Sequence, residues 1–240
     1  MATTKGPGTT GAGTETTTAG AATTAARATT AVGASGAPAA PAAPATGHRR
    51  GRPRSFDRDA ALEQALRLFW EHGYEATSVA DLTTAMGIRP PSLYAAFGDK
   101  RALFAEVVAR YRESHGAYAT RALAEEPTAR AGVARMLREA AAQATDPDHP
   151  WGCLLITSTV NCTTPEVVEA VRELRNANVR ALESRIRADV AAGHEPAGTD
   201  PAALAQFTAT VLQGMSQRAR DGAGRAALER VADDAMRIWP

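Results

Sequence analysis

The sequence predicts an all-α fold, and three observations support this prediction. Apolar residues recur at helical spacing in successive segments, for example at Leu62, Ala65, Leu66 and Phe69. Gly, Pro and Asp residues separate these segments and supply the ends that helices need. The chain has 240 residues, of which 44% are hydrophobic, which is enough for one or two domains with a buried core.

Residues 1–48 differ from the rest of the chain in composition. They are almost entirely Ala, Thr, Gly and Pro, and only Lys5, Glu15 and Arg27 are charged. Such a segment cannot bury enough apolar surface to offset the entropy lost on ordering, so we predict a disordered tail. A tail that binds a partner is the alternative.

A basic arm at residues 49–56 follows the tail. Residues 49–58 hold five arginines against one acid, although the whole chain carries a formal charge of only +1. Arg52 and Arg54 lie in an Arg-Gly-Arg-Pro-Arg stretch, and Arg-Gly-Arg-Pro is the core of an AT-hook, whose arginines enter the narrow minor groove of A·T-rich DNA. We therefore expect the arm to contact DNA, with a solvated basic linker as the alternative.

Residues 57–110 are predicted to form a three-helix DNA-binding domain. Its first helix covers residues 57–72, ends at Gly73 and carries a packing stripe that includes Trp70. We expect this first helix to pack against the two helices that follow and to support them.

Those two helices are predicted from capping and turn residues between positions 78 and 97. Ser78 and Asp81 form a capping box, so the helix starts near Val79, and Gly87 suits the left-handed conformation that ends it. Pro90 or Pro91 fits the first turn of the next helix, in which Leu93 and Phe97 face inward together. This is a helix-turn-helix, whose second helix enters the major groove of DNA.

Three groups of residues carry a resemblance to a known family. They are His72-Gly73-Tyr74-x-x-Thr77-Ser78, Gly87-Ile88 and Ser92-Leu93-Tyr94-x-x-Phe97-x-x-Lys100. Together they resemble the DNA-binding domain of the tetracycline-repressor (TetR) family. The resemblance implies a homodimeric, all-helical repressor of a double-stranded DNA operator, released when a small-molecule effector binds the C-terminal domain. It also implies DNA contacts, and with the arm the expected set is Arg52, Arg54, Thr77, Ser78, Arg89, Pro91, Ser92, Tyr94 and Lys100.

Residues 111–240 are expected to form a helical ligand-binding and dimerisation domain. One helix should run from Lys100 to about Glu125, and the apolar run Trp151–Cys162 reads as a short buried helix or a strand, with the resemblance favouring a helix. The remaining predicted helices cover residues 128–145, 165–192 and 201–220 and a last segment after the break at Asp221–Gly224.

Two sets of residues in this domain are expected to be functional. The resemblance places the dimer in the last two long helices, with their apolar stripes covering the monomer core as the alternative; the expected interface is Leu204, Phe207, Val211, Met215, Leu228, Val231 and Ile238. The expected lining of the ligand pocket is Trp151, Ile156 and Phe207.

Other classes of function find weaker support. A regulator that senses oxidants or electrophiles through Cys153 or Cys162 is one alternative, although burial in an apolar run makes a thiol inert. An architectural DNA-binding protein that uses the arginine arm is another. We find no Gly-rich phosphate loop, no nucleophile elbow and no metal-ligand cluster, so we expect no enzyme, no metal and no cofactor. We find no membrane span or secretory signal, so we expect a cytoplasmic protein.

Overall fold

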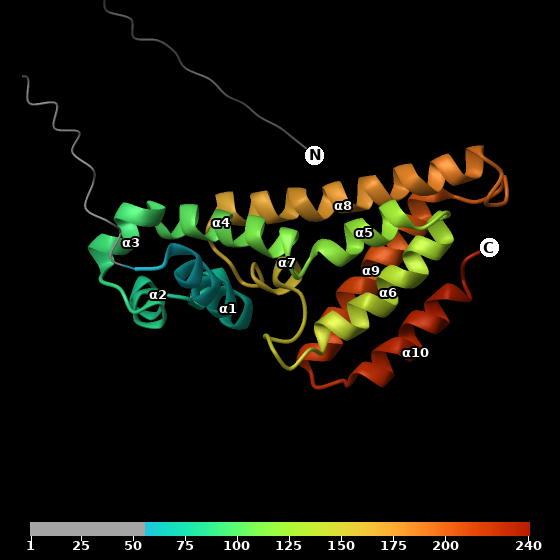
Figure 1. Ribbon diagram of the computed structural model, residues 1–240. Coiled ribbons are helices and arrows are strands. Elements are labelled where there is room, and N and C mark those ends of the chain that lie inside the picture. The colour runs from blue at the N-terminus through green and yellow to red at the C-terminus, as the bar shows by residue number, and fades with distance from the viewer. Residues whose placement is uncertain (1–55) are drawn as a thin grey trace, which may run out of the picture. The chain divides into compact units, whose positions relative to one another are not determined.

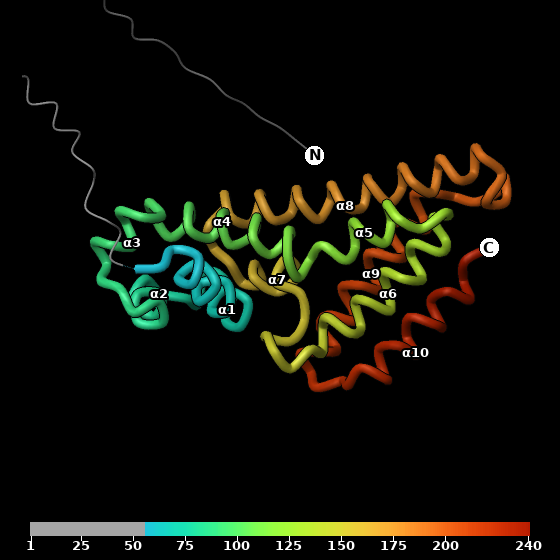
Figure 2. The backbone as a smooth tube through the Cα atoms, in the orientation of Figure 1, coloured from blue at the N-terminus to red at the C-terminus, as the bar shows by residue number. Residues whose placement is uncertain are grey.

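The computed structural model describes residues 56–240, and the structural statements below refer to that part of the chain. The predicted tail, Arg52, Arg54 and the rest of the arm up to residue 55 lie outside the described residues. From residue 56 onward the chain forms helices α1–α10 and no strand (Figures 1 and 2), so the all-α prediction is confirmed. Within residues 56–240, every helix is too short or too polar to span a bilayer.

The first four helices are α1 (Arg58–Ala76), α2 (Val79–Met86), α3 (Pro90–Phe97) and α4 (Lys100–Glu113). They share a core in which Phe69 contacts the rings of Tyr74 and Phe104, with centroid separations of 5.9 and 5.1 Å. Leu82 and Leu93 bring α2 and α3 into the same core and are fully buried. Burial of each such side chain stabilises the fold by roughly 1.5–3 kcal/mol, which fixes the helix-turn-helix on α1 and α4.

Gly73 breaks α1, as predicted, although one further helical turn follows it. Its φ of 81° and ψ of 171° are not helical, and a Cβ at this position would lie 3.2 Å from the carbonyl oxygen of Ser158. The break lets the amide of Tyr74 donate a 2.8 Å hydrogen bond to that oxygen. Glycine is required here both for its backbone conformation and for the close approach of the later segment.

The remaining helices, apart from α7, share a second core. They are α5 (Ala117–Glu125), α6 (Ala129–Ala144), α7 (Leu154–Thr157), α8 (Pro165–Ala191), α9 (Pro201–Arg220) and α10 (Arg225–Met236). Figure 1 shows α6 beside α5, α9 and α10, and α8 packs against α6 and α9. Their shared core includes Leu137, Ile186, Met215 and Leu228, all essentially inaccessible to solvent.

The prediction of one helix from Lys100 to about Glu125 is wrong. α4 ends at Glu113, and Ser114 leaves helical geometry with φ −111° and ψ −96°. The amide of Gly116 then donates to the carbonyl oxygen of Tyr111 at 2.8 Å, and a Cβ on Gly116 would lie 3.1 Å from the Tyr111 ring. The chain at the break thus packs closely against Tyr111, and a new helix starts at Ala117.

The segment Trp151–Cys162 contains a short helix, as the favoured reading predicted, but only Leu154–Thr157 is helical. Leu154 and Leu155 are buried in the first core, whereas the rest of the segment is made of turns. This connection between α6 and α8 therefore packs in the first core, although α6 before it belongs to the second.

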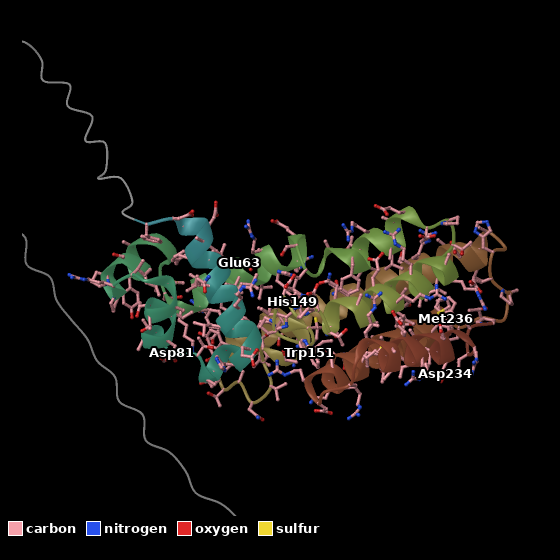
Figure 3. The ribbon with its side chains drawn as sticks, turned by 60° about the horizontal axis from the view of Figure 1, so that its bottom comes forward. Glu63, Asp81, His149, Trp151, Asp234 and Met236 are labelled. Carbon is pink, nitrogen blue, oxygen red and sulfur yellow. The ribbon has the colours of Figure 1, made fainter. Side chains whose placement is uncertain are left out.

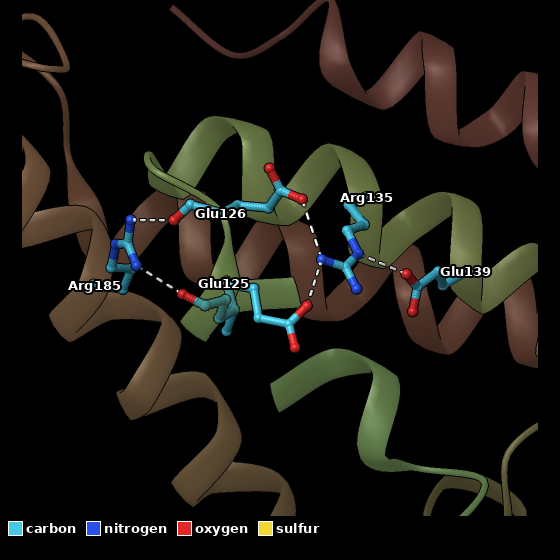
Figure 4. A network of polar contacts seen from close by, with 6 residues as sticks. Glu125, Glu126, Arg135, Glu139 and Arg185 are labelled. Carbon is cyan, nitrogen blue, oxygen red and sulfur yellow. Dashed lines mark hydrogen bonds and ion pairs between the residues drawn. The ribbon is translucent and has the colours of Figure 1, made fainter. Parts of the chain in front are cut away.

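Hydrogen bonds and ion pairs from two arginine side chains stabilise the turn between α5 and α6. Arg135 contacts the carboxylates of Glu125, Glu126 and Glu139 at 2.9, 3.2 and 2.7 Å (Figure 4). Arg185 of α8 donates to the carbonyl oxygens of Leu123 and Glu126 at 2.6 and 3.0 Å. These bonds satisfy carbonyl groups at the end of α5 that the helix leaves unpaired.

Candidate nucleic-acid interface and ligand cavity

The helix-turn-helix has the caps that its sequence predicts. The Ser78 hydroxyl accepts from the amide of Asp81 at 3.1 Å, and the Asp81 carboxylate accepts from the amide of Ser78 at 2.9 Å. Gly87 takes the left-handed conformation, with φ 64°, and α3 begins with Pro90 and Pro91. The two helices are therefore joined by a short turn with defined geometry.

One face of α3 packs against the protein core, and the opposite face is exposed to solvent. Leu93 and Phe97 are buried, whereas Arg89, Pro91 and Tyr94 are exposed. Tyr94 is 51% exposed, unusual for a large aromatic residue, so its hydroxyl can reach a partner outside the protein. Ser92 is half-buried near the start of the helix. An exposed short helix on a rigid core is the geometry with which a recognition helix enters the major groove.

Thr77, Ser78 and Lys100 differ from these exposed residues, because Thr77 is buried and the polar groups of Ser78 and Lys100 already contact the protein. Thr77 is buried, and its hydroxyl donates to the carbonyl oxygen of Gly73 at 2.7 Å. The Ser78 hydroxyl donates to Asp81 at 2.6 Å. The Lys100 ammonium lies 4.3 Å from the centre of the Tyr74 ring, and burial is the main cause that lowers the pKa of Lys100. We therefore leave the Thr77 side chain out of the DNA-facing set, and Lys100 is a positioned cation rather than a freely moving one.

A cavity of about 640 Å³ lies among α4, α5, α6, α8, α9 and the α7 segment. This size falls within the range of about 300–1,000 Å³ that is typical of small-molecule sites. Ile156 lines the cavity as predicted, but Trp151 and Phe207 do not. Trp151 is 37% exposed in the turn before α7, and Phe207 packs against the second core, so these two ligand-contact predictions are wrong for this cavity.

Polar groups from several helices reach the cavity wall. The Tyr111 hydroxyl donates to Cys153 Sγ at 3.3 Å, and the amide of Cys153 donates to the Ser216 hydroxyl at 2.8 Å. Gln143 and Arg175 also line the cavity. The sequence reasoning missed these residues because they come from separate helices and share no motif.

The surroundings of both cysteines favour the neutral thiol over the thiolate. Burial raises the pKa of Cys153 and is also the main cause that raises the pKa of Cys162, so both are protonated thiols at neutral pH. The thiolate is the reactive form of cysteine.

Direct contacts connect α1, which packs against the helix-turn-helix, to helices that line the cavity. The Glu75 carboxylate, at the end of α1, accepts from the amide and hydroxyl of Thr163 at 3.1 and 2.9 Å, just before α8. Arg220 of α9 donates to the carbonyl oxygens of Trp70 and Glu71 at 3.3 and 2.9 Å.

Aromatic packing supports the same junction. His149 stacks on Trp70 with a centroid separation of 4.4 Å and lies two residues before Trp151, in the turn that precedes α7 (Figure 3). Tyr111 packs edge-on against the same Trp70 ring, with a centroid separation of 4.9 Å, and these three rings are called the Trp70 cluster below. Tyr111 therefore touches both the cavity thiol and a helix of the DNA-binding unit.

The expected dimer residues divide into three groups by exposure. Met215 and Leu228 are buried in the second core of their own chain, so the prediction that they contact a partner is wrong for this structure. Leu204, Phe207 and Val211 are partly buried against that core. Val231 and Ile238, in α10 and just after it, are 42% and 61% exposed and remain available to a partner.

Comparisons with known proteins agree with this arrangement. Residues 61–107 match the family described as bacterial regulatory proteins, tetR family, and residues 129–234 match the description Tetracyclin repressor-like, C-terminal domain. The Escherichia coli transcriptional repressor ComR is 39% identical over 197 residues, covering 80% of this chain and 92% of ComR. The E. coli repressor BdcR is 31% identical over 172 residues, covering 72% of this chain and 83% of BdcR.

A solved structure is similar over the same region. It contains a cysteine-substituted mutant of the TetR family transcriptional regulator CifR, in complex with 26-base-pair double-strand operator DNA. The match has a TM-score of 0.76 and 46% sequence identity, and it covers 79% of this chain and all of the CifR chain, 100%.

Proposed function

Because the chain belongs to the tetR family of bacterial regulatory proteins, which are DNA-binding transcriptional regulators, we propose that it is a homodimeric repressor of a palindromic operator. A small molecule in the cavity between α4 and α9 releases it from DNA. The observation that carries the proposal is the two-sided α3, in which Leu93 and Phe97 are buried and Tyr94 is exposed.

The proposed DNA contacts follow from that geometry. Ser92, near the start of α3, reaches base edges, while Tyr94 binds a phosphate oxygen from the side of the helix. Arg89, Pro91 and Lys100 lie around the same helix and complete the proposed contact face, with Ser78 at its edge. Arg52 and Arg54, in the part of the chain before residue 56, are proposed to add phosphate or minor-groove contacts.

The contacts between α1 and the cavity helices support the proposed response to an effector. Glu75 binds the residues that open α8, and Arg220 binds the carbonyl oxygens of Trp70 and Glu71 in α1. Later residues of α8 and earlier residues of α9 line the cavity. A ligand that displaces α8 or α9 therefore also displaces α1 through these contacts. Small shifts at packed interfaces can be amplified into discrete rotations of whole helices or domains.

The proposed role consists of binding and conformational coupling, with no catalytic step. The family acts on DNA, so we place the protein in the cytoplasm at the nucleoid.

Selection of duplexes from a random pool tests the operator proposal. A dimeric repressor should enrich a palindrome whose half-sites lie about one helical turn of DNA apart. The Kd for the selected duplex should be at least about a thousandfold lower than for a scrambled duplex at the same salt concentration. A pool without enrichment would contradict operator recognition and favour the architectural alternative.

A thiol-sensing regulator is the second candidate function. It is favoured by one observation, namely that Cys153 lines the cavity and accepts a hydrogen bond from Tyr111. The raised pKa of Cys153 opposes it, because a protonated thiol reacts slowly with oxidants and electrophiles.

A further inference from the structure

Arg175 is the arginine of α8 that lacks an ion pair. Within the described chain, Arg172 pairs with Glu169, Arg180 with Glu173, Arg185 with Asp189 and Arg187 with Glu183. Arg175 has Val171 and Val179 four residues away on either side and therefore no acid at that helical spacing. It is also the one arginine of the helix that lines the cavity.

The Arg175 guanidinium is held in place along one edge. Its Nη1 donates to the carbonyl oxygen of Leu155 at 2.8 Å and to the hydroxyl of Thr159 at 3.2 Å. Its Nε and Nη2 donate to no residue in the part of the chain that the structure describes. The guanidinium is thus oriented by two neutral acceptors, while further N–H groups stay available for a ligand.

The surroundings do not neutralise this cation. Arg112 and Glu113 are the other charged residues of the cavity wall, and both are exposed at its edge. The Cys153 thiol is protonated because burial raises its pKa, so it provides no counter-charge. Burial also lowers the pKa of Arg175, which reflects the cost of keeping a charge there without a carboxylate.

We propose that the cavity binds small amphipathic carboxylic acids and that Arg175 holds their carboxylate while the apolar wall holds the carbon chain. Arginine is suited to this because its planar group donates two parallel hydrogen bonds to a carboxylate. The inference rests on the proposed function, because it names the chemical class of the effector at that same cavity.

Matched probes test the proposal on the wild-type protein. Octanoate and 1-octanol share a flexible eight-carbon chain and differ in the charge of the head group, so both fit the same apolar wall. By isothermal titration calorimetry, octanoate should bind at least about tenfold more tightly than 1-octanol, which corresponds to about 1.4 kcal/mol. Equal affinity for the two probes, or a preference for 1-octanol, would overturn the proposal without any variant.

Two substitutions on α8 then locate the effect. Arg175→Gln should reduce the preference for octanoate to within a factor of about two, because the charge is lost. Arg172→Gln is the matched control, since Arg172 lies one turn earlier, is exposed and should leave the preference unchanged. Should Arg175→Gln unfold, Arg175→Lys keeps a cation but not the planar fork, and octanoate should bind it more weakly than the wild type while still being preferred to 1-octanol.

The outcomes separate this inference from the proposed function. Octanoate binding that depends on Arg175 but leaves the selected operator bound would support the anchor and contradict the effector role of the cavity. An undiminished preference for octanoate in Arg175→Gln would overturn the anchor and leave the repressor proposal intact.

Discussion

At the scale of the residue, three tyrosines show how surroundings decide a role that sequence leaves open. Tyr94 is exposed on α3, whereas Tyr74 is buried beneath the Lys100 ammonium. Tyr111 is buried and donates to Cys153, and burial raises the pKa of Tyr111 well above its usual range. Of these three, Tyr94 alone has the exposed ring that the proposed DNA contact needs, while Tyr111 connects the cavity to the Trp70 cluster.

Substitutions on α3 should separate phosphate contacts from base contacts. Tyr94→Phe should weaken binding to operator and to scrambled duplexes equally, by on the order of 1 kcal/mol, because one hydrogen bond to a phosphate is lost. Ser92→Ala should instead change the preferred sequence. The measurement is a titration at fixed salt concentration, with circular dichroism as the control for folding. A Tyr94→Phe variant that loses only operator binding would mean that Tyr94 contacts bases.

The two thiols should react slowly at neutral pH. Because their pKa values are raised, the thiolate forms only as the pH rises above the ordinary value of about 8.5, and alkylation by iodoacetamide should accelerate only there. Mass spectrometry of the intact wild type, Cys153→Ser and Cys162→Ser follows each site. Rapid alkylation of Cys153 at pH 7, together with loss of DNA binding, would favour the thiol sensor over a reversibly bound effector.

At the scale of the element, the ends of α1 and α8 depend on one carboxylate. Glu75 binds the amide and hydroxyl of Thr163 and is within 3.4 Å of the Thr164 hydroxyl and the Cys162 thiol. The hydrogen bond from the Thr163 amide is the main cause that lowers the pKa of Glu75. A negative charge beside the start of a helix also interacts favourably with the helix dipole.

Removal of the Glu75 carboxylate should lower stability and weaken coupling. Glu75→Ala should unfold at a lower temperature than Glu71→Ala, a control one turn earlier on α1 whose side chain has no hydrogen bond or ion pair among the described residues. Glu75→Ala should also need a higher effector concentration for release from DNA, because the contact that transmits a movement of α8 to α1 is lost. Equal melting temperatures and equal effector responses in the two variants would show that this junction is passive.

The same contact predicts a dependence of stability on pH. Since the folded pKa of Glu75 is lowered, its contribution is present above the unfolded value of about 4.3 and is lost as the pH falls through the lower folded value. The difference in melting temperature between wild type and Glu75→Ala should therefore be constant at neutral pH and shrink in acid. A difference that grows in acid would contradict this assignment.

At the scale of the whole molecule, the sequence predicted correctly the features that depend on neighbouring residues in the chain. The caps at Ser78 and Gly87, the buried pair Leu93 and Phe97 and the bounds of α6 and α8 follow from spacing and turn chemistry. The features that the sequence did not predict depend on packing between residues far apart in the chain. The break before Ala117 packs against the Tyr111 ring, and the cavity wall combines residues from several helices that no motif links.

The dimer is the remaining feature that depends on the whole molecule, and exposure identifies where to test it. Val231 of α10 is 42% exposed, whereas Leu228 on the same helix is buried in its own chain. Val231→Glu should give a folded monomer, because a charge is costly to bury in an apolar interface between two copies.

The matched control is Val160→Glu, at a valine that is 63% exposed in the turn after α7. Sedimentation equilibrium should show a monomer for the first variant and a dimer for the second. The monomer should also bind the palindromic operator more weakly, because it occupies one half-site without the second. A Val231→Glu variant that stays dimeric would move the interface away from this face of α10.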